Sequence, residues 1–252
     1  MSLWLEGASR SYPPLPSDTT ADVAIVGGGI AGIATAYFLA RRGAKPVVLE
    51  ARGVAEAASG RNAGFLLAGV AENFVAASRR YGSANALRIW TLTERTRTLV
   101  RSLVAEHGID CELRWNGSDQ IAGDDAEWSE VAESARLLAA RGVRVSVDDA
   151  ARTARYHEDG EIHPVRWVRG LAAAAVRAGA RIHEDTRVTG VDDGVVRTTG
   201  GTVTAGAVVL CTNAYTAHLA GTRVFQRLHQ RAQQPAVRDV AVDHQHRHRP
   251  VA

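Results

Sequence analysis

Three glycines and one acidic residue have the types and spacing of a nucleotide-binding site. Gly27, Gly29 and Gly32 form a G-x-G-x-x-G turn, and Glu50 follows about 20 residues later. In such a turn the first glycine permits a tight bend, the second lets the backbone approach a pyrophosphate, and the third lets a helix pack closely on a strand. A carboxylate at this separation accepts hydrogen bonds from a ribose hydroxyl. The four residues therefore predict a dinucleotide site.

The residues around this turn favour the elements that such a site needs. An apolar strand is expected over residues 23–26, an amphipathic helix over 30–42 and a second strand over 46–49. The amides of Ile30 and Ala31 begin the helix and would face the phosphates, because a helix N-terminus carries a positive partial charge. The alternative is an apolar strand–helix pair with incidental glycines, which requires these features to coincide by chance.

Composition excludes several classes of protein. The chain has 252 residues and a net charge of +3, and no Lys/Arg block alternates with aromatic residues, so a nucleic-acid partner is not expected. Cys111 and Cys211 form no metal-ligand pair, which fits a reducing compartment. The apolar run over residues 23–40 begins far from the N-terminus and is interrupted by glycines. We therefore expect a cytoplasmic protein without a membrane span.

Two segments lack a regular period. Residues 1–20 include Tyr12-Pro13-Pro14-Leu15-Pro16 and are expected to form an N-terminal arm that lies over the domain or is partly disordered, with Trp4 as its anchor. Residues 51–69 are rich in Ala and Gly, which suits a segment whose backbone approaches a ligand.

Residues 76–149 are expected to form an insertion of helices and strands. The spacing of apolar residues predicts a helix over 85–107, and Asp124 is expected to cap a second helix that ends at Arg141. Between them, Asn116-Gly117 predicts a hairpin of strands 111–115 and 118–122.

The nucleotide-binding domain is then expected to resume over residues 150–218. A helix is predicted over 165–178, before strands at 181–183, 187–191, 195–199 and 202–204 that include a small antiparallel meander. A final apolar strand over 207–211 leads into Thr212 and Asn213. Small polar residues after a buried strand belong at the carboxyl edge of a parallel sheet, where open α/β folds bind ligands.

Residues 219–252 have a different composition. They hold five of the six glutamines and four of the nine histidines of the chain, and apolar periodicity disappears. One interpretation is a disordered polar terminus. A sharper hypothesis is a shifted reading frame near residues 220–224, which the nucleotide sequence in the other frames would test. His244, His246 and His248 could bind a metal adventitiously, but no functional metal site is expected.

Four segments between residues 21 and 218 match one known family. They are the glycine turn with Glu50, Ala-Ser-Gly-Arg-Asn-Ala-Gly at 58–64, Gly-Glu-Ile-His-Pro at 160–164, and Val-Val-Leu-Cys-Thr-Asn-Ala-Tyr at 208–215. Together they resemble the D-amino-acid-oxidase-like (DAO) family of FAD-dependent oxidoreductases. The Ser-Gly-Arg-Asn stretch is most similar to its amine-oxidising branch, which includes glycine oxidase, sarcosine oxidase and γ-glutamylputrescine oxidoreductase.

The resemblance implies an α/β fold with FAD as the cofactor. A Rossmann-like FAD-binding domain, with a parallel sheet, helices and a β-meander, would comprise residues 21–75 and 150–218, and an incomplete α+β substrate-domain insertion would comprise 76–149. The residues that it places at FAD are Gly27, Gly29, Ile30, Ala31, Gly32, Glu50, Ala51, Arg52, Ser59, Gly60, Arg61, Asn62, Val188, Thr212 and Asn213. For Arg61, an ordinary solvated arginine is the alternative.

The resemblance also implies a reaction. A small amine or amino acid would be oxidised by hydride transfer to the flavin, giving an imine that water hydrolyses, so no nucleophilic residue is required. No catalytic residue is assigned, and His163 is expected to begin a helix with Pro164 rather than to act as a base.

The chain departs from the family in its length and tail. Family members continue with a last strand, glycine turn and helix over the flavin, and residues 221–252 do not resemble that part. We therefore expect a C-terminally truncated chain with weak FAD binding and poor turnover. The alternatives are an inactive nucleotide-binding fragment and an NAD-dependent dehydrogenase, although the glycine-rich segment 51–69 is unusual for the latter.

Overall fold

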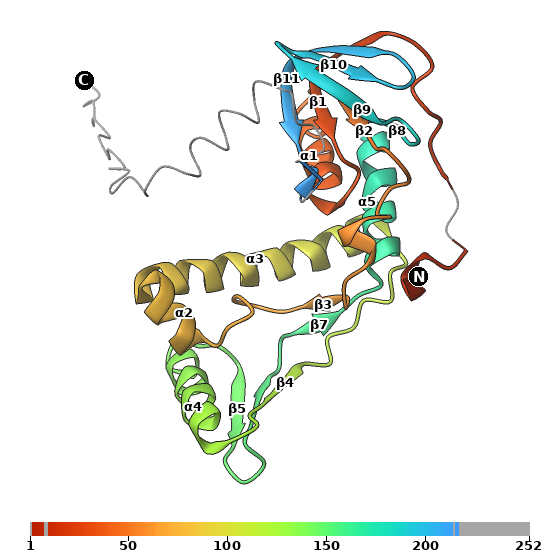
Figure 1. Cartoon of the computed structure of the whole chain (residues 1–252). Coiled ribbons are helices and arrows are strands. Elements are labelled where there is room, and N and C mark those ends of the chain that lie inside the picture. Colours follow the sequence, from red (N-terminus) through yellow and green to blue (C-terminus); the bar gives the residue numbers. More distant parts are fainter. Residues whose placement is uncertain (1, 8–9, 214, 217–252) are drawn as a thin grey trace, which may run out of the picture.

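A six-stranded mixed sheet organises one part of the computed structural model, which describes residues 2–7, 10–213 and 215–216 (Figure 1). The sheet has the order β8-β2-β1-β11-β10-β9. Four of these strands are parallel, and β9 and β10 extend the sheet as an antiparallel meander. Their bounds are β1 (Thr19–Val26), β2 (Pro46–Leu49), β8 (Arg181–His183), β9 (Val188–Asp192), β10 (Val195–Thr198) and β11 (Thr202–Leu210). The predicted α/β class with a parallel sheet and a meander is confirmed.

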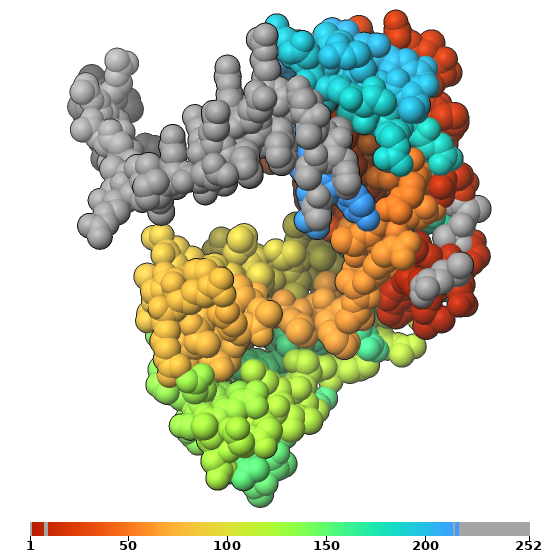
Figure 2. Space-filling model, in the orientation of Figure 1, coloured from red at the N-terminus to blue at the C-terminus, as the bar shows by residue number. Residues whose placement is uncertain are grey.

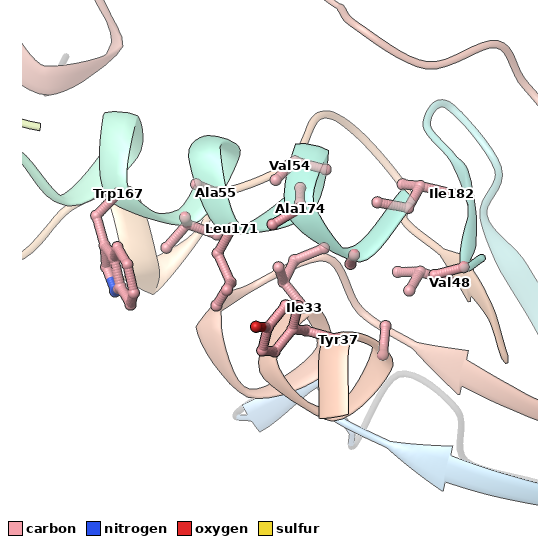
Figure 3. Close-up of a cluster of buried hydrophobic side chains, with 14 of the residues drawn as sticks. Ile33, Tyr37, Val48, Val54, Ala55, Trp167, Leu171, Ala174 and Ile182 are labelled. Atoms are coloured by element: carbon pink, nitrogen blue, oxygen red, sulfur yellow. The ribbon is translucent and has the colours of Figure 1, made fainter. Parts of the chain in front are cut away.

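Two helices, α1 (Ile30–Ala40) and α5 (Pro164–Arg177), cover one face of this sheet (Figure 1). Figure 3 shows Ile33 and Tyr37 of α1 and Leu171 of α5 packed with Val48 of β2. Each of these side chains is at most 1% exposed. Burying such apolar surface is the main favourable contribution to folding.

The opposite face of the sheet carries a second buried cluster, which includes side chains of the meander and of the N-terminal arm. Because successive side chains of a strand point to opposite faces, Ala24 and Val26 lie on the other side from Ile25. They pack with Val196 of β10 and with Leu15 of the arm. The expected arm therefore lies over the domain where it is described.

The second part of the fold combines three helices with short strands. The long helix α3 (Ser83–His107) begins beside α2 and ends near α1 and α5 (Figure 1). A three-stranded antiparallel sheet has the order β4-β6-β5. The elements are α2 (Phe74–Tyr81), α4 (Asp125–Ala139), β4 (Ser118–Ile121), β5 (Val145–Asp148) and β6 (Thr153–Tyr156), with the pair β3 (Phe65–Leu66) and β7 (Gly160–Glu161) and two 3₁₀ turns, η1 (Leu3–Leu5) and η2 (Ala58–Gly60).

Local signals predicted the helix ends well. Gly108 ends α3 in the left-handed conformation with φ 60°. The side chain of Asp124 caps α4 by accepting a hydrogen bond from the Glu127 amide. His163 is the N-cap of α5 and Pro164 its first residue, as expected. Helix α1 ends at Ala40, two residues earlier than expected.

The hairpin predicted around Asn116-Gly117 is wrong. Gly117 does adopt a positive φ of 76°, but β4 pairs with β6, and Arg114 pairs with Glu161 of β7. The Asn-Gly pair thus joins no hairpin, because the segments on its two sides pair with strands that are distant in sequence, residues 118–121 with β6 and Arg114 with Glu161. The strands expected at 202–204 and 207–211 also form one strand, β11, which β1 pairs along its length despite Gly206.

Strands β6 and β7 follow residue 150 but pair with the second part of the fold. The division of the chain into domains at residues 75 and 150 stays a prediction.

Residues 219–252, with the proposed frameshift and the three histidines, lie outside the described residues. Among the helices that the structure describes, none is long and apolar enough to span a membrane.

Candidate functional site

The glycine turn joins β1 to α1 beside the end of β11. Gly27 has φ 110°, and a Cβ atom there would lie 2.7 Å from the Cys211 carbonyl oxygen. A Cβ atom on Gly32 would lie only 1.9 Å from the Gly27 carbonyl oxygen. Both positions therefore require glycine, as the fingerprint predicts: the first for its backbone conformation, the second for close helix packing.

The first turn of α1 presents backbone donors. The Ile33 amide donates to Gly29 O at 3.0 Å and begins the helical pattern. The Ile30 amide donates to the Ser59 hydroxyl at 2.9 Å. Within the described residues, no acceptor pairs with the amides of Ala31 and Gly32. Free amides and the helix dipole together form a site suited to an anion such as a phosphate.

Glu50 follows β2 and folds back toward this turn. Its Oε2 atom accepts a 2.6 Å hydrogen bond from the Gly28 amide, and its Oε1 atom accepts a 2.9 Å bond from the Arg52 amide. Its backbone carbonyl accepts from the Thr186 amide at 2.8 Å. Val188, two residues beyond Thr186, is 8% exposed and belongs to the buried cluster that contains Val26 and Leu49, the last residues of β1 and β2. The structure thus brings the predicted acid, the turn and the start of β9 together.

The segment around η2 lies next to the start of α1. A Cβ atom on Gly29 would be 2.9 Å from the Ser59 hydroxyl, so this position is also close-packed. Gly60 packs against α5, where a Cβ atom would lie 2.8 Å from Val165 Cγ2. The Asn62 side chain accepts from the Gly64 amide at 2.8 Å and thereby shapes the loop.

Two predicted arginines lie near this region, of which Arg61 is exposed and Arg52 is half-buried. Arg61 donates from Nε to the Glu56 carbonyl at 2.9 Å. Its guanidinium is therefore held by its own loop, and the solvated alternative remains open. The guanidinium carbon of Arg52 lies 5.8 Å from the centre of the Tyr215 ring, and Ala51 lies between Arg52 and Glu50.

Thr212 and Asn213 lie at the carboxyl edge of the parallel strands. The Cys211 amide donates to Val26 O at 2.8 Å, which places the end of β11 directly beside the glycine turn. The Thr212 hydroxyl contacts that of Thr216 at 2.7 Å, and Asn213 has φ 47°. This location agrees with the sequence-based expectation.

Sequence reasoning missed Glu184, a buried carboxylate behind the site. It is 1% exposed and accepts hydrogen bonds from the amides of Ser11, Tyr12 and Val54 at 2.6, 2.8 and 2.7 Å. The feature of the sequence that could have indicated Glu184 is an acidic residue directly after β8, at the same sheet edge as Glu50. Its three partners come from segments distant in sequence, which local patterns do not reveal.

The described residues contain no group of three metal-ligating side chains close enough to hold a metal ion. Burial raises the pKa of the Cys111 and Cys211 thiols, so both are neutral at neutral pH. The site thus offers hydrogen-bond donors and one carboxylate for binding, rather than a nucleophile.

A separate cavity of about 450 Å³ lies in the second part of the fold. Its walls include Phe65, Trp90, Tyr156 and Asp159. Asp159 is buried and paired with Arg97 of α3. No residue of the glycine turn is among those that line the cavity.

Comparisons with known proteins agree with this geometry. The family profile "DAO: FAD dependent oxidoreductase" matches residues 22–250, and thus extends over most of the segment with unusual composition, for which the frameshift stays a prediction. The chain is 30% identical over 233 residues to γ-glutamylputrescine oxidoreductase of Escherichia coli (strain K12), covering 85% of this chain and 54% of that protein.

A second relative is known in sequence and in structure. The chain is 30% identical to glycine oxidase of Geobacillus kaustophilus (strain HTA426) over 226 residues, or 81% of this chain and 57% of that protein. The crystal structure of glycine oxidase from Geobacillus kaustophilus superposes with a TM-score of 0.67 at 27% identity, covering 79% of this chain and 57% of that chain. The chain spans about half the length of the curated relatives that it matches.

The family match covers the whole of the glycine turn, the Glu50 region and the end of β11, and it favours FAD over a nicotinamide cofactor for this fingerprint. The chain belongs to the DAO family of FAD-dependent oxidoreductases.

Proposed function

We propose that the protein of which this chain is at least a part oxidises a small amine or amino acid with FAD. The observation that carries the proposal is the convergence of the free amides of Ala31 and Gly32 with the carboxylate of Glu50 at one sheet edge. The amides form an anion site that fits a pyrophosphate, and the carboxylate beside it can accept a hydrogen bond from a ribose hydroxyl, so the pair fits a dinucleotide. Family membership supports FAD as that dinucleotide.

Each predicted residue has a role in this proposal. Gly27, Gly29 and Gly32, with the amides of Ile30 and Ala31, hold the pyrophosphate. Glu50 holds the adenosine ribose, and Ala51, Arg52 and the backbone of Val188 contact the adenosine side. The segment from Ser59 through Gly60 and Arg61 to Asn62 faces the ribityl side, and Thr212 and Asn213 contact the cofactor at the strand end.

FAD supplies the hydride acceptor when bound. The residues of this chain would bind and orient it: the α1 amides stabilise the phosphate charge, and the Glu50 carboxylate exchanges its bond with the Gly28 amide for one with a ribose hydroxyl. Gly29 leaves no room for a side chain beside Ser59, and the lack of a side chain there keeps the approach of the phosphates open. No proton transfer by a side chain is assigned.

The substrate class rests on the relatives. One of them is a γ-glutamylputrescine oxidoreductase and another a glycine oxidase. We therefore propose an amine or amino acid as substrate. The reduced state of Cys111 and Cys211 supports the further proposal of a cytoplasmic location.

A cofactor titration tests the proposal. The purified chain is titrated with FAD, FMN and NAD. Flavin fluorescence follows the binding of the first two, and the thermal midpoint, which a ligand specific for the folded state raises, follows the binding of all three. Saturable binding of FAD but not of NAD is expected. Retention of NAD alone would contradict the cofactor assignment. FAD-loaded chain is then mixed anaerobically with glycine, sarcosine and γ-glutamylputrescine. Slow bleaching of the flavin band by one of them, in keeping with the poor turnover expected above, is the sign of amine oxidation.

A further inference from the structure

The N-terminal arm is hydrogen-bonded to the loop that contains Ser59. The Ser2 hydroxyl donates to the Gly60 carbonyl at 2.7 Å, and Trp4 Nε1 donates to the Asn62 carbonyl at 2.8 Å. Figure 2 shows the red residues of the arm in contact with the orange residues of this loop on one edge of the molecule. The loop carbonyls are therefore turned toward the arm.

Trp4 also connects this loop to α5. Its ring lies edge-on to the ring of His163, with 4.9 Å between the centres, and His163 is the N-cap of α5. The loop itself contacts the cofactor-side helix, because Ser59 accepts a hydrogen bond from the Ile30 amide. One side of the loop is thus held by the arm, and the other side meets the N-terminus of α1.

A second attachment lies at the other end of the arm. The buried carboxylate of Glu184 bonds the amides of Ser11 and Tyr12 as well as the amide of Val54, which precedes the loop. A buried carboxylate is tolerated only when hydrogen bonds replace its hydration, so this junction is expected to be rigid. Arg10 adds ion pairs to Glu56 and Asp185.

We propose that the N-terminal arm is a positioning latch, in which Ser2 and Trp4 set the conformation of residues 59–62 that receives the cofactor. The inference rests on the proposed function, since the ligand is FAD. If the loop adopts the binding conformation for a smaller fraction of time, the apparent affinity falls by that fraction. The latch acts through the Gly60 and Asn62 carbonyls and does not itself contact FAD.

The test compares the double variant Ser2→Ala/Trp4→Phe with Leu3→Ala. The double variant removes both donors but keeps an aromatic ring beside His163, whereas Leu3 is 70% exposed and serves as the matched control. We expect the double variant to bind FAD about tenfold more weakly, from the loss of two hydrogen bonds. Both variants should remain folded without FAD, which equal circular dichroism spectra would show.

Hydrogen–deuterium exchange provides a readout without cofactor. In the double variant, amides of residues 59–64 should exchange at least several-fold faster than in the control, while the amides of α1 beyond its first turn stay unchanged, because only the Ile30 amide is bonded to this loop. Equal FAD affinity and equal exchange in the two variants would overturn the latch. If the unmodified chain takes up no FAD, the proposed function fails, and unchanged loop exchange would then refute the latch separately.

Discussion

The carboxylate of Glu50 accepts a 2.6 Å hydrogen bond from the backbone amide of Gly28. These residues follow β2 and β1, two neighbouring parallel strands, so the bond joins the strand ends at the carboxyl edge of the sheet. Open α/β sheets bind ligands at this edge. The acid is thereby held beside the turn, in a position to exchange a backbone donor for a ligand hydroxyl.

Glu50→Gln should weaken FAD binding by about tenfold or more, because a hydrogen bond to a charged acceptor is stronger than one to an amide oxygen. The amide oxygen can still accept from Gly28, so the unfolding free energy should change little. Titration of flavin fluorescence measures the effect. Glu72→Gln, which alters an exposed ion pair with Arg80, is the control and should leave the affinity unchanged. An affinity within twofold of the unmodified chain would contradict the role of Glu50.

Gly29→Ala should separate folding from cofactor binding. The new methyl group would meet the Ser59 hydroxyl at 2.9 Å, and that side chain can rotate away, so the fold is retained. The methyl group would then occupy the approach of the pyrophosphate, and FAD binding should fall by at least about tenfold. Circular dichroism and FAD titration of the same sample check both parts. Full affinity in a folded variant would show that the phosphates lie elsewhere.

Gly32→Ala should instead damage the fold itself. Its methyl group would lie 1.9 Å from the Gly27 carbonyl oxygen, and this backbone atom cannot move without displacing α1 from β1. We expect a loss of about 3 kcal/mol of unfolding free energy, measured by urea denaturation without cofactor. Gly43→Ala is a suitable comparison. Within the described part of the chain, apart from neighbouring residues, no atom lies within 4 Å of its Cβ position, so its φ of 86° is what opposes the substitution. Equal stability of the two variants would contradict the close packing.

Arg97→Met should destabilise the second part of the fold strongly. Arg97 and Asp159 are 7% and 4% exposed, and among the described residues the substitution leaves the buried carboxylate with only Ser118 as a side-chain hydrogen-bond partner. Breaking such a pair costs about 3–5 kcal/mol. Arg97→Met combined with Asp159→Leu should cost less than Arg97→Met alone, because no unpaired charge remains. Urea denaturation measures both, and Arg144→Met, at an exposed pair with Glu158, should cost less than about 1 kcal/mol.

Tyr156 should make the fold sensitive to alkaline pH. Burial, and secondarily the charge of Asp159, raises the pKa of its hydroxyl from 10.0 to about 12. The neutral form is thus favoured in the folded state, and this stabilisation is present below pH 10 and is lost between pH 10 and 12. Between pH 10 and 11 the unfolding free energy of the unmodified chain should therefore fall by about 1 kcal/mol more than that of Tyr156→Phe. Urea denaturation at pH 10 and pH 11 measures this difference, with Tyr81→Phe, at an exposed tyrosine, as control. An equal fall of the unfolding free energy in all three proteins would contradict the raised pKa of Tyr156.

The sequence by itself determined the elements whose signals are local. The strand before Gly27, the helix after it and the caps at Asp124 and Gly108 agree with their predictions, because each depends on a few neighbouring residues. The spacing from the glycine turn to Glu50 likewise indicated a nucleotide site, since a strand–helix–strand unit fixes which strand ends become neighbours.

The tertiary structure decided what depends on distant partners. Residues 118–121 pair with β6 and not with the segment before Asn116-Gly117. Strand pairing depends on packing against cross-strand neighbours, so a local turn signal does not decide it alone. Glu184 joins the N-terminal arm to the loop at Val54 because the amides of Ser11 and Val54 both donate to its carboxylate in the folded chain. Such contacts join residues more than 100 positions apart, and no periodicity of the sequence encodes them. Local patterns therefore indicated which strand ends meet at the candidate site, whereas the hydrogen bonds between its loop and the N-terminal arm could not be predicted from them.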